Sequence, residues 1–227
     1  MKAILAKKVG MTQIFKDDKA IPVTVLEAGP CFVTQVKTEE KDGYEAIQLG
    51  FLPARKIRKP QEGHLKGLEK LRHLREFRIG ELEKTPVAVE IKEEGEPTDE
   101  KEVQKGIEIA KKGEKVTVDM FSEGDVVQVS GISKGRGFQG VVKRHGFKTG
   151  PMAHGSDHHR EPGSIGSTYP QRVIKGKKMP GHYGVDKVTV KNLKVVSVDA
   201  ANNILAISGA VPGANGGLVI VMGDKER

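Results

Sequence analysis

The sequence predicts a mostly β protein, and three observations carry the prediction. Short runs rich in Val, Ile and Thr recur in both the first and the last part of the chain. Gly, Pro, Asp and Asn separate these runs, a spacing typical of an antiparallel β-sheet or β-barrel. The two groups of runs are separated by a charge-rich segment, residues 54–113, that lacks this strand pattern. We therefore expect one β domain that is interrupted by an insertion.

The first group of runs predicts an N-terminal set of strands. Each run is bounded by a turn signal such as Lys41-Asp42-Gly43. The predicted strands cover residues 4–6, 11–15, 21–27, 31–37 and 44–51. The second group predicts strands at residues 116–121, 126–130, 187–190, 193–199, 204–207 and 218–222. Together they define a discontinuous β-barrel domain made of residues 1–53, 114–131 and 184–227.

The residues between these groups, 54–113, have a different pattern. Leucine or phenylalanine recurs every three residues between His64 and Phe77, which predicts a short helix packed on the sheet, although Gly67 weakens it. Another strand is expected over residues 85–91. A charge-rich helix capped by Asp99 is expected within residues 93–113. We interpret the whole of 54–113 as an α/β insertion.

A third region, residues 132–183, carries the charge asymmetry of the chain. It holds ten Lys and Arg residues but only two acidic residues, Asp157 and Glu161, so its balance of +8 equals the net charge of the whole protein. It also holds 10 of the 28 glycines, and no helical or strand period persists in it. Glycine raises the entropic cost of ordering, and scattered apolar residues cannot offset that cost. We expect an extended, non-globular loop that a polyanionic partner orders.

Composition excludes several classes of protein. The single cysteine, Cys31, rules out an internal disulfide framework and fits a reducing cytosol, where we expect it as a small buried apolar residue. No apolar run approaches the roughly 20 residues of a membrane span, and residues 3–6 are too short for a signal-peptide core. We expect a soluble, cytoplasmic protein with no small-molecule substrate, cofactor or membrane partner.

Residues 135–140 match the pattern G-x-G-x-x-G after a predicted strand. An enzyme that holds a nucleotide there is one alternative hypothesis, but a dinucleotide site needs a helix that opens at the third glycine. Residues 141–146 look like poor helix material, and none of the other kinase motifs follows. Glycines beside basic residues also allow a backbone to approach phosphates closely, which is the interpretation we favour.

The histidines of this region are alternative metal ligands. His154, Asp157, His158 and His159 match no standard zinc spacing, and neutral histidines can also donate to phosphates or stack on bases. Neighbouring Ser156, Asp157 and His158 cannot place a catalytic triad in line. We therefore predict no metal site and no catalytic residue.

Aromatic residues interleaved with cations suit stacking on unpaired bases combined with phosphate neutralisation. Phe138 and Phe147 could equally pack in the root of the loop, and the basic run at residues 172–179 could be a solvated loop. The candidate RNA-binding residues are Lys134, Arg136, Lys143, Arg144, His145, Lys148, His154, His158, His159, Arg160, Tyr169, Arg172, Lys175, Lys177, Lys178 and His182. A regulatory protein that binds RNA or DNA is a further alternative.

Several motifs resemble the bacterial large-subunit ribosomal protein L3 family. They include KKVGMTQIF near the N-terminus, KPQEGH, SKGRGFQGVVKRHGF, PGSIGS, IKGKKMPGHYG, VTVKNLKVV and GAVPGANGG, and they span the chain from near Lys7 to Val221. The resemblance implies a β-barrel of the translation-protein type, interrupted by an α/β insertion.

The same resemblance implies a role in the ribosome without enzymatic activity. The long loop would thread into 23S rRNA and approach the peptidyl transferase centre, and the protein would bind early, near the 3′ end of that RNA, to nucleate subunit assembly. Ribosomal proteins L14 and L19 are the implied neighbours. The loop tip would fall at residues 164–172. Some bacterial members carry a methylated glutamine before a proline there, but this chain has Ser167, Thr168 and Tyr169 before Pro170, so that modification is not carried over.

Overall fold

The computed structural model describes residues 2–16, 18–78 and 111–223. The chain separates into two compact units. One unit, here called the β unit, comprises residues 1–131 and 189–227, and the other, the basic unit, comprises residues 132–188. Antiparallel strands dominate the secondary structure, which confirms the predicted mostly β class.

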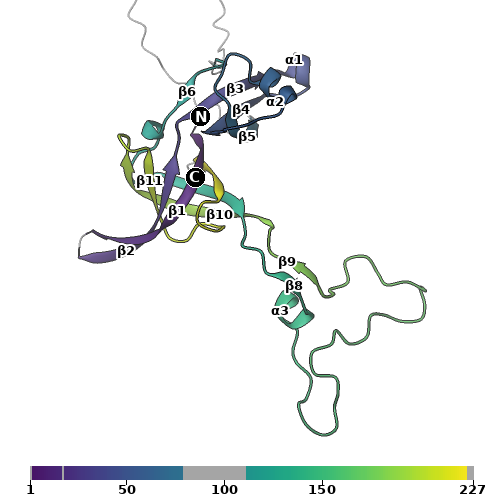
Figure 1. Cartoon of the computed structure of the whole chain (residues 1–227). Helices are drawn as coiled ribbons and strands as arrows, with labels where there is room; N and C mark the ends of the chain where they lie inside the picture. Colours follow the sequence, from purple (N-terminus) through teal and green to yellow (C-terminus); the bar gives the residue numbers. More distant parts are fainter. Residues whose placement is uncertain (1, 17, 79–110, 224–227) are drawn as a thin grey trace, which may run out of the picture. The chain divides into compact units, whose positions relative to one another are not determined.

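Six strands of the β unit form a sheet that closes on itself in the order β1-β12-β7-β10-β11-β2 (Figure 1). Their bounds are β1 Ala3–Lys16, β2 Lys19–Ala28, β7 Val126–Ile132, β10 Lys187–Asp199, β11 Ile204–Ser208 and β12 Leu218–Gly223. Ala6 of β1 shows how the ring closes, because it pairs with Val219 of β12 on one side and with Ala28 of β2 on the other. The two predicted strands at 187–190 and 193–199 are one continuous strand, β10.

A second, four-stranded sheet has the order β5-β4-β3-β6. Its strands are β3 Cys31–Lys37, β4 Ala46–Pro53, β5 Leu71–Arg78 and the two-residue β6 Lys115–Val116. The sequence placed residues 31–53 in the barrel domain, whereas strand pairing puts β3 and β4 in this second sheet. The chain changes sheet at Gly29-Pro30, which separates β2 from β3. The domain limits drawn from the sequence otherwise stay a prediction.

The prediction of a helix between His64 and Phe77 is wrong. The helix α2, Lys59–His64, ends where that pattern begins, and the second part of the pattern, from Leu71, forms β5. Leu71 and Phe77 are six residues apart, so in a strand they share one face, and both are buried. Pairing with β4 along the whole of β5 overrides the helical spacing.

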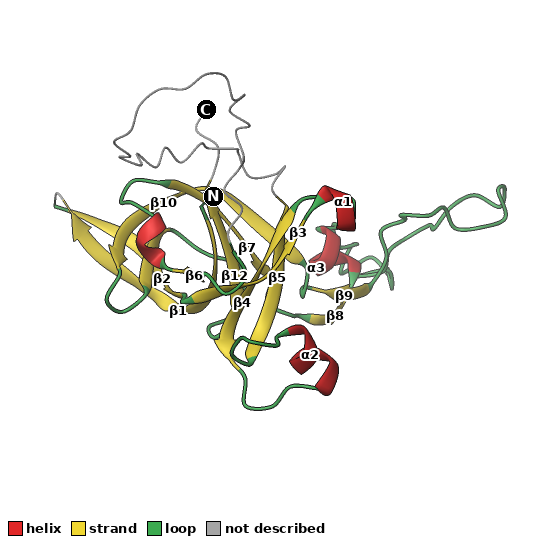
Figure 2. Ribbon diagram, turned by 90° about the horizontal axis from the view of Figure 1, so that it is seen from above, coloured by secondary structure: helices red, strands yellow, loops and turns green. Residues whose placement is uncertain are grey.

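The remaining short elements connect the strands of the β unit. Helix α1, Glu39–Asp42, lies between β3 and β4 and ends at Gly43, which has the positive φ of 77° that glycine tolerates. Figure 2 shows α1 and α2 beside the four-stranded sheet. A 3-10 helix, η2 Val118–Met120, replaces most of the strand predicted at 116–121. The strand predicted at 85–91 lies outside the described residues, as does nearly all of the helix predicted within 93–113.

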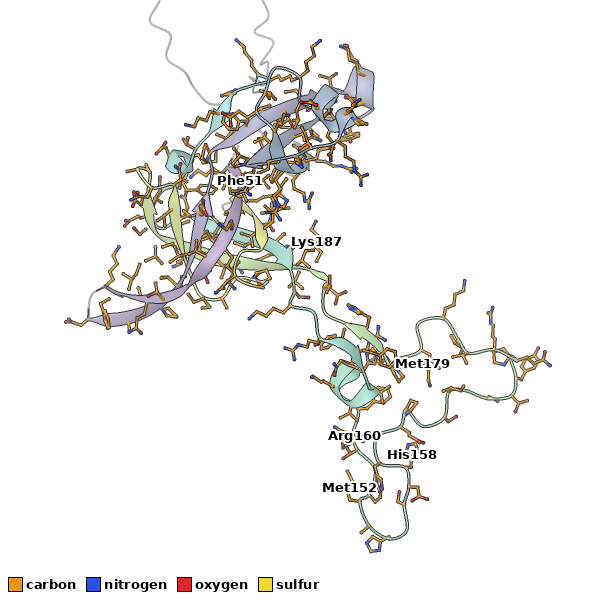
Figure 3. All side chains as sticks on the ribbon, viewed as in Figure 1. Phe51, Met152, His158, Arg160, Met179 and Lys187 are labelled. Carbon is orange, nitrogen blue, oxygen red and sulfur yellow. The ribbon has the colours of Figure 1, made fainter. Side chains whose placement is uncertain are left out.

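Both sheets contribute to one hydrophobic core. Almost completely buried in it are Ile4 and Leu5 of β1, Leu205 of β11, and Val33 and Phe51 of the second sheet. Figure 3 labels Phe51. Cys31 is buried as expected, and its thiol lies 3.4 Å from the carbonyl oxygen of Leu5. Burial raises the pKa of the Cys31 thiol to about 12. In the described part of the chain, no helix has the length and apolar character needed to cross a bilayer.

The close packing of Gly50 in β4 gives a test of this core. A Cβ atom on Gly50 would lie 2.3 Å from Cδ1 of Leu71 and 2.8 Å from Cγ2 of Thr34. Because overpacking forces neighbouring side chains to shift, Gly50→Ala should lower the free energy of unfolding by about 1–3 kcal/mol in urea denaturation.

Gly63→Ala is the matched control, because Gly63 lies in α2 with no atom within 4 Å of its Cβ position. That control should be neutral or stabilising by up to about 1 kcal/mol. Equal effects of the two substitutions would show that the packing of Leu71 on β4 is described incorrectly.

Candidate nucleic-acid interface

The basic unit has a folded root that sequence reasoning missed. Strand β8, Gly137–Gln139, pairs with β9, Gly181–Tyr183, and Phe138 lies opposite His182. Helix α3, Val141–His145, follows β8 directly, although residues 141–146 were expected to be poor helix formers. Val141 is buried, and the helix ends at Gly146 with a φ of 69°. Tertiary contacts supply what the local sequence lacks.

Two candidate RNA-binding residues hold this root together. The Arg144 guanidinium donates a hydrogen bond of 2.8 Å to the carbonyl oxygen of Met179, which lies just before β9. The His145 ring nitrogen Nε2 lies 3.1 Å from the same oxygen and is therefore its second donor. Both side chains are half-buried. The outgoing and returning parts of the chain are thus joined at Met179, which Figure 3 labels.

The start and the end of the basic unit are also joined by backbone contacts. The Arg136 amide donates to the carbonyl oxygen of Tyr183 at 2.9 Å, and the Ser133 amide donates to that of Asp186 at 2.9 Å. The Arg136 guanidinium lies over the Tyr183 ring, 5.6 Å from its centre. Gly184 is buried here, with a φ of 81°, and a Cβ atom on it would lie only 2.2 Å from the carbonyl oxygen of Lys134. Only glycine fits this crossing.

Beyond α3 the chain makes a first excursion, residues 147–162, that contains the histidine cluster. The Gly150 amide donates to the carbonyl oxygen of His159 at 2.9 Å and closes the excursion into a loop. Nδ1 of His159 lies 2.8 Å from the carbonyl oxygen of Pro151, and Nδ1 of His158 lies 3.1 Å from a carboxylate oxygen of Glu161. His154 is exposed. Figure 3 shows His158 and Arg160 on one branch of this loop.

These histidines do not converge on a common point. Within residues 2–16, 18–78 and 111–223, no group of three or more His, Cys, Asp or Glu side chains is placed to hold a metal ion. The imidazoles of His158 and His159 instead make contacts within the loop, with Glu161 and Pro151. They stay candidates for phosphate or base contacts.

The second excursion, residues 163–180, has neither helix nor strand. Its few internal bonds are turn contacts, such as the Gln171 amide to the carbonyl oxygen of Thr168 at 2.9 Å. The side chains of Tyr169 and Ile174 are 85% and 65% exposed. The four cations of this excursion are also exposed: Arg172, Lys175, Lys177 and Lys178. Nothing in the described chain covers them.

The cations of the basic unit differ from those of the β unit in their partners. In the β unit, five lysines each lie within 4.0 Å of a carboxylate oxygen: Lys2, Lys7, Lys16, Lys37 and Lys70. Among the described residues, none of the ten Lys and Arg residues of 132–183 has such an ion pair. The remaining candidates Lys134, Lys143, Lys148 and Arg160 are exposed like those of the second excursion. The unit therefore presents uncompensated positive charge to an anionic partner.

The G-x-G-x-x-G motif does not form a nucleotide-binding loop. Its second glycine begins β8, so the motif is largely a strand paired with β9. Helix α3 does open after Gly140, but it is only five residues long. The alternative that Phe138 packs in the root is also wrong, because its side chain is 77% exposed, whereas Phe147 is half-buried near the His145 ring.

Sequence reasoning missed three kinds of residue in this interface. Met179 contributes a backbone oxygen, for which side-chain identity gives no signal. Gly184 lies outside the basic segment as we bounded it. Ile165 and Ile174, exposed by 46% and 65%, could have been found as apolar residues in a segment that buries almost nothing.

Gly184 offers a test of the root. Gly184→Ala should open the crossing with Lys134, because the new Cβ atom would collide with backbone. We expect faster amide hydrogen exchange at Ser133 and Arg136, measured by mass spectrometry or NMR.

Gly176→Ala is the control, because Gly176 has nearly the same φ, 83°, but no atom within 4 Å of its Cβ position. It carries the same backbone strain without the collision. Protection that falls equally in both variants would contradict the proposed crossing.

Comparison with known proteins identifies the family. Residues 70–208 match the family model described as Ribosomal protein L3. A protein of Thermosipho africanus called large ribosomal subunit protein uL3 is 48% identical over 224 residues, covering 97% of each chain. Proteins of the same name are 51% identical in Pelotomaculum thermopropionicum, covering 97% of this chain and 95% of the relative, and 48% identical in Thermotoga maritima, covering 99% and 98%. The resemblance seen in the sequence motifs is confirmed, and the chain belongs to the ribosomal protein L3 family.

Proposed function

We propose that this chain is a structural, non-enzymatic constituent of the large ribosomal subunit that binds 23S rRNA directly through residues 132–183. Family membership supports the place in the ribosome. The observation that carries the RNA-binding role is the set of ten Lys and Arg residues without a carboxylate partner among the described residues. Uncompensated charge of this density favours association with a polyanion, which releases condensed counterions on binding.

The chemistry of binding follows from the exposed parts of the basic unit. Because glycine has no side chain, the backbone can approach phosphate oxygens closely at these positions. The neighbouring cations neutralise phosphates that otherwise repel each other. Tyr169, with 85% of its side chain exposed, offers a ring for stacking on an unpaired base. Arg144 and His145 support this surface indirectly, because they are committed to the Met179 carbonyl oxygen.

We extend the proposal to the position of the chain in the subunit. In this account it binds near the 3′ end of 23S rRNA, nucleates assembly, and directs the tip at residues 164–172 toward the peptidyl transferase centre. Ribosomal proteins L14 and L19 are its proposed neighbours. The support is the motif resemblance together with the exposure of every residue of that tip.

Salt dependence of RNA binding tests the role of the basic segment. If about half of its ten cations contact phosphate, their contribution to the slope of log affinity against log salt lies between about −3.5 and −4.5. Deleting residues 132–183 should remove that contribution and weaken binding to a 23S rRNA fragment. A finer variant replaces Arg172, Lys175, Lys177 and Lys178 with Gln and should flatten the slope by about 0.7–0.9 for each phosphate contact that is lost.

The control replaces four exposed lysines of the β unit, Lys111, Lys112, Lys191 and Lys194, with Gln, which gives the same change in net charge. An unchanged slope in the deletion variant, or equal flattening in both fourfold variants, would rule out the segment as the main contact. Retention on the large subunit through a high-salt sucrose gradient separates a ribosomal protein from a regulator that acts elsewhere.

A further inference from the structure

The residues outside 132–183 have a net charge of zero, but a second basic region lies among them. Residues 54–78 contain nine Lys and Arg residues but only three glutamates, a balance of +6. Residues 79–110 contain four lysines and ten acidic residues, a balance of −6. The two segments cancel in the sum, so net charge alone does not reveal the first one. Helix α2 and strand β5 both lie within 54–78.

The structure places part of this charge around a cavity in the β unit. The cavity has a volume of about 330 Å³. Its lining residues are Lys7 of β1, Leu52 and Pro53 at the end of β4, Arg72 and His73 of β5, Gly216, and Leu218 of β12. Strand β5 is an edge of the four-stranded sheet, so among the described residues its outer side has no strand partner. The volume falls in the range of about 300–1,000 Å³ typical of ligand sites.

The electrostatics of the cavity favour an anion. Three of its lining side chains are basic and none is acidic. The pKa of His73 lies below its ordinary value, first because of burial and then because of the positive charges of Arg72 and Arg75, which favours the neutral imidazole, so His73 offers a hydrogen bond and not a charge. Lys7 pairs with Glu27 at 3.1 Å, whereas Arg72 is exposed and has no ion pair within the described residues. Within the described part of the chain, no hydrogen bond or ion pair engages the Arg72 guanidinium.

We propose that this cavity binds a backbone phosphate of RNA, with Arg72 as the principal donor and Lys7 and His73 beside it. The β unit would then hold RNA independently of residues 132–183. A guanidinium fork matches the paired oxygens of a phosphate, and a small concave site suits a group that projects from a polymer better than it suits a flat protein surface. The inference rests on the proposed function, because it assumes that the chain binds RNA.

The test measures binding of the full-length protein to a short RNA duplex of mixed sequence across a range of salt concentrations. Arg72→Gln should weaken binding about tenfold at low salt and reduce the salt slope by about 0.9, the loss of one phosphate contact. Inorganic phosphate should weaken RNA binding by the intact protein more than it weakens binding by the variant. Arg72 is exposed, so thermal unfolding should be unchanged.

Lys19→Gln is the matched control, because Lys19 is an exposed cation at the start of β2, paired with Lys16 of β1, and it does not line the cavity. It should change the affinity for RNA by less than about twofold, and the salt slope should stay within about 0.2 of that of the intact protein. Equal effects of the two variants, or no effect of Arg72→Gln, would overturn the proposal that the cavity binds an RNA phosphate. The same holds if Arg72→Gln spares RNA binding but abolishes binding of polyglutamate, which would indicate an acidic protein partner. Absence of RNA binding by the intact protein would instead overturn the proposed function.

Discussion

Repulsion among uncompensated cations is the constraint on which the organisation of this protein depends. Residues 132–183 carry ten positive charges against two negative ones, so no internal ion pairing can neutralise them. Burying such charges without partners is far more costly than leaving them in water. The segment therefore stays out of the hydrophobic core, buries little beyond Val141, and keeps nine of its ten cations exposed. The segment thus makes few demands on the packing of the rest of the chain.

A rigid root limits the entropic cost of such a segment. The chain leaves the closed sheet at the end of β7 and re-enters it at the start of β10, and these strands are neighbours in that sheet. Ser130 and Thr189 join them through a side-chain hydrogen bond of 2.7 Å. The β8–β9 pair and the bonds to the Met179 carbonyl oxygen then fix the first residues on each side. In the proposed complex with RNA, only the two excursions would have to be ordered, which would reduce the free energy lost on binding.

The sequence was sufficient for features that depend on local pattern and on charge. The β-branched runs gave residues 31–37 as a strand with the bounds that the structure has, and the charge balance located the basic segment. Features that depend on partners distant in sequence were missed. Leu71 and Phe77 became a strand because β4 pairs with them, and Val141–His145 became a helix because Val141 is buried and Met179 accepts two hydrogen bonds. The cavity at Arg72 was missed because opposite charges in neighbouring segments cancelled in the sum.

Hydrogen exchange of residues 163–180, measured in the free full-length protein and in the large subunit, tests the central claim most directly. The account predicts exchange near unprotected rates in the free protein, because turn contacts are the main backbone bonds there, and strong protection in the subunit. The root amides of Arg136 and Arg144 should be protected in both states, since each is bonded within the root. Strong protection of residues 163–180 in RNA-free protein would contradict the claim that RNA orders this segment.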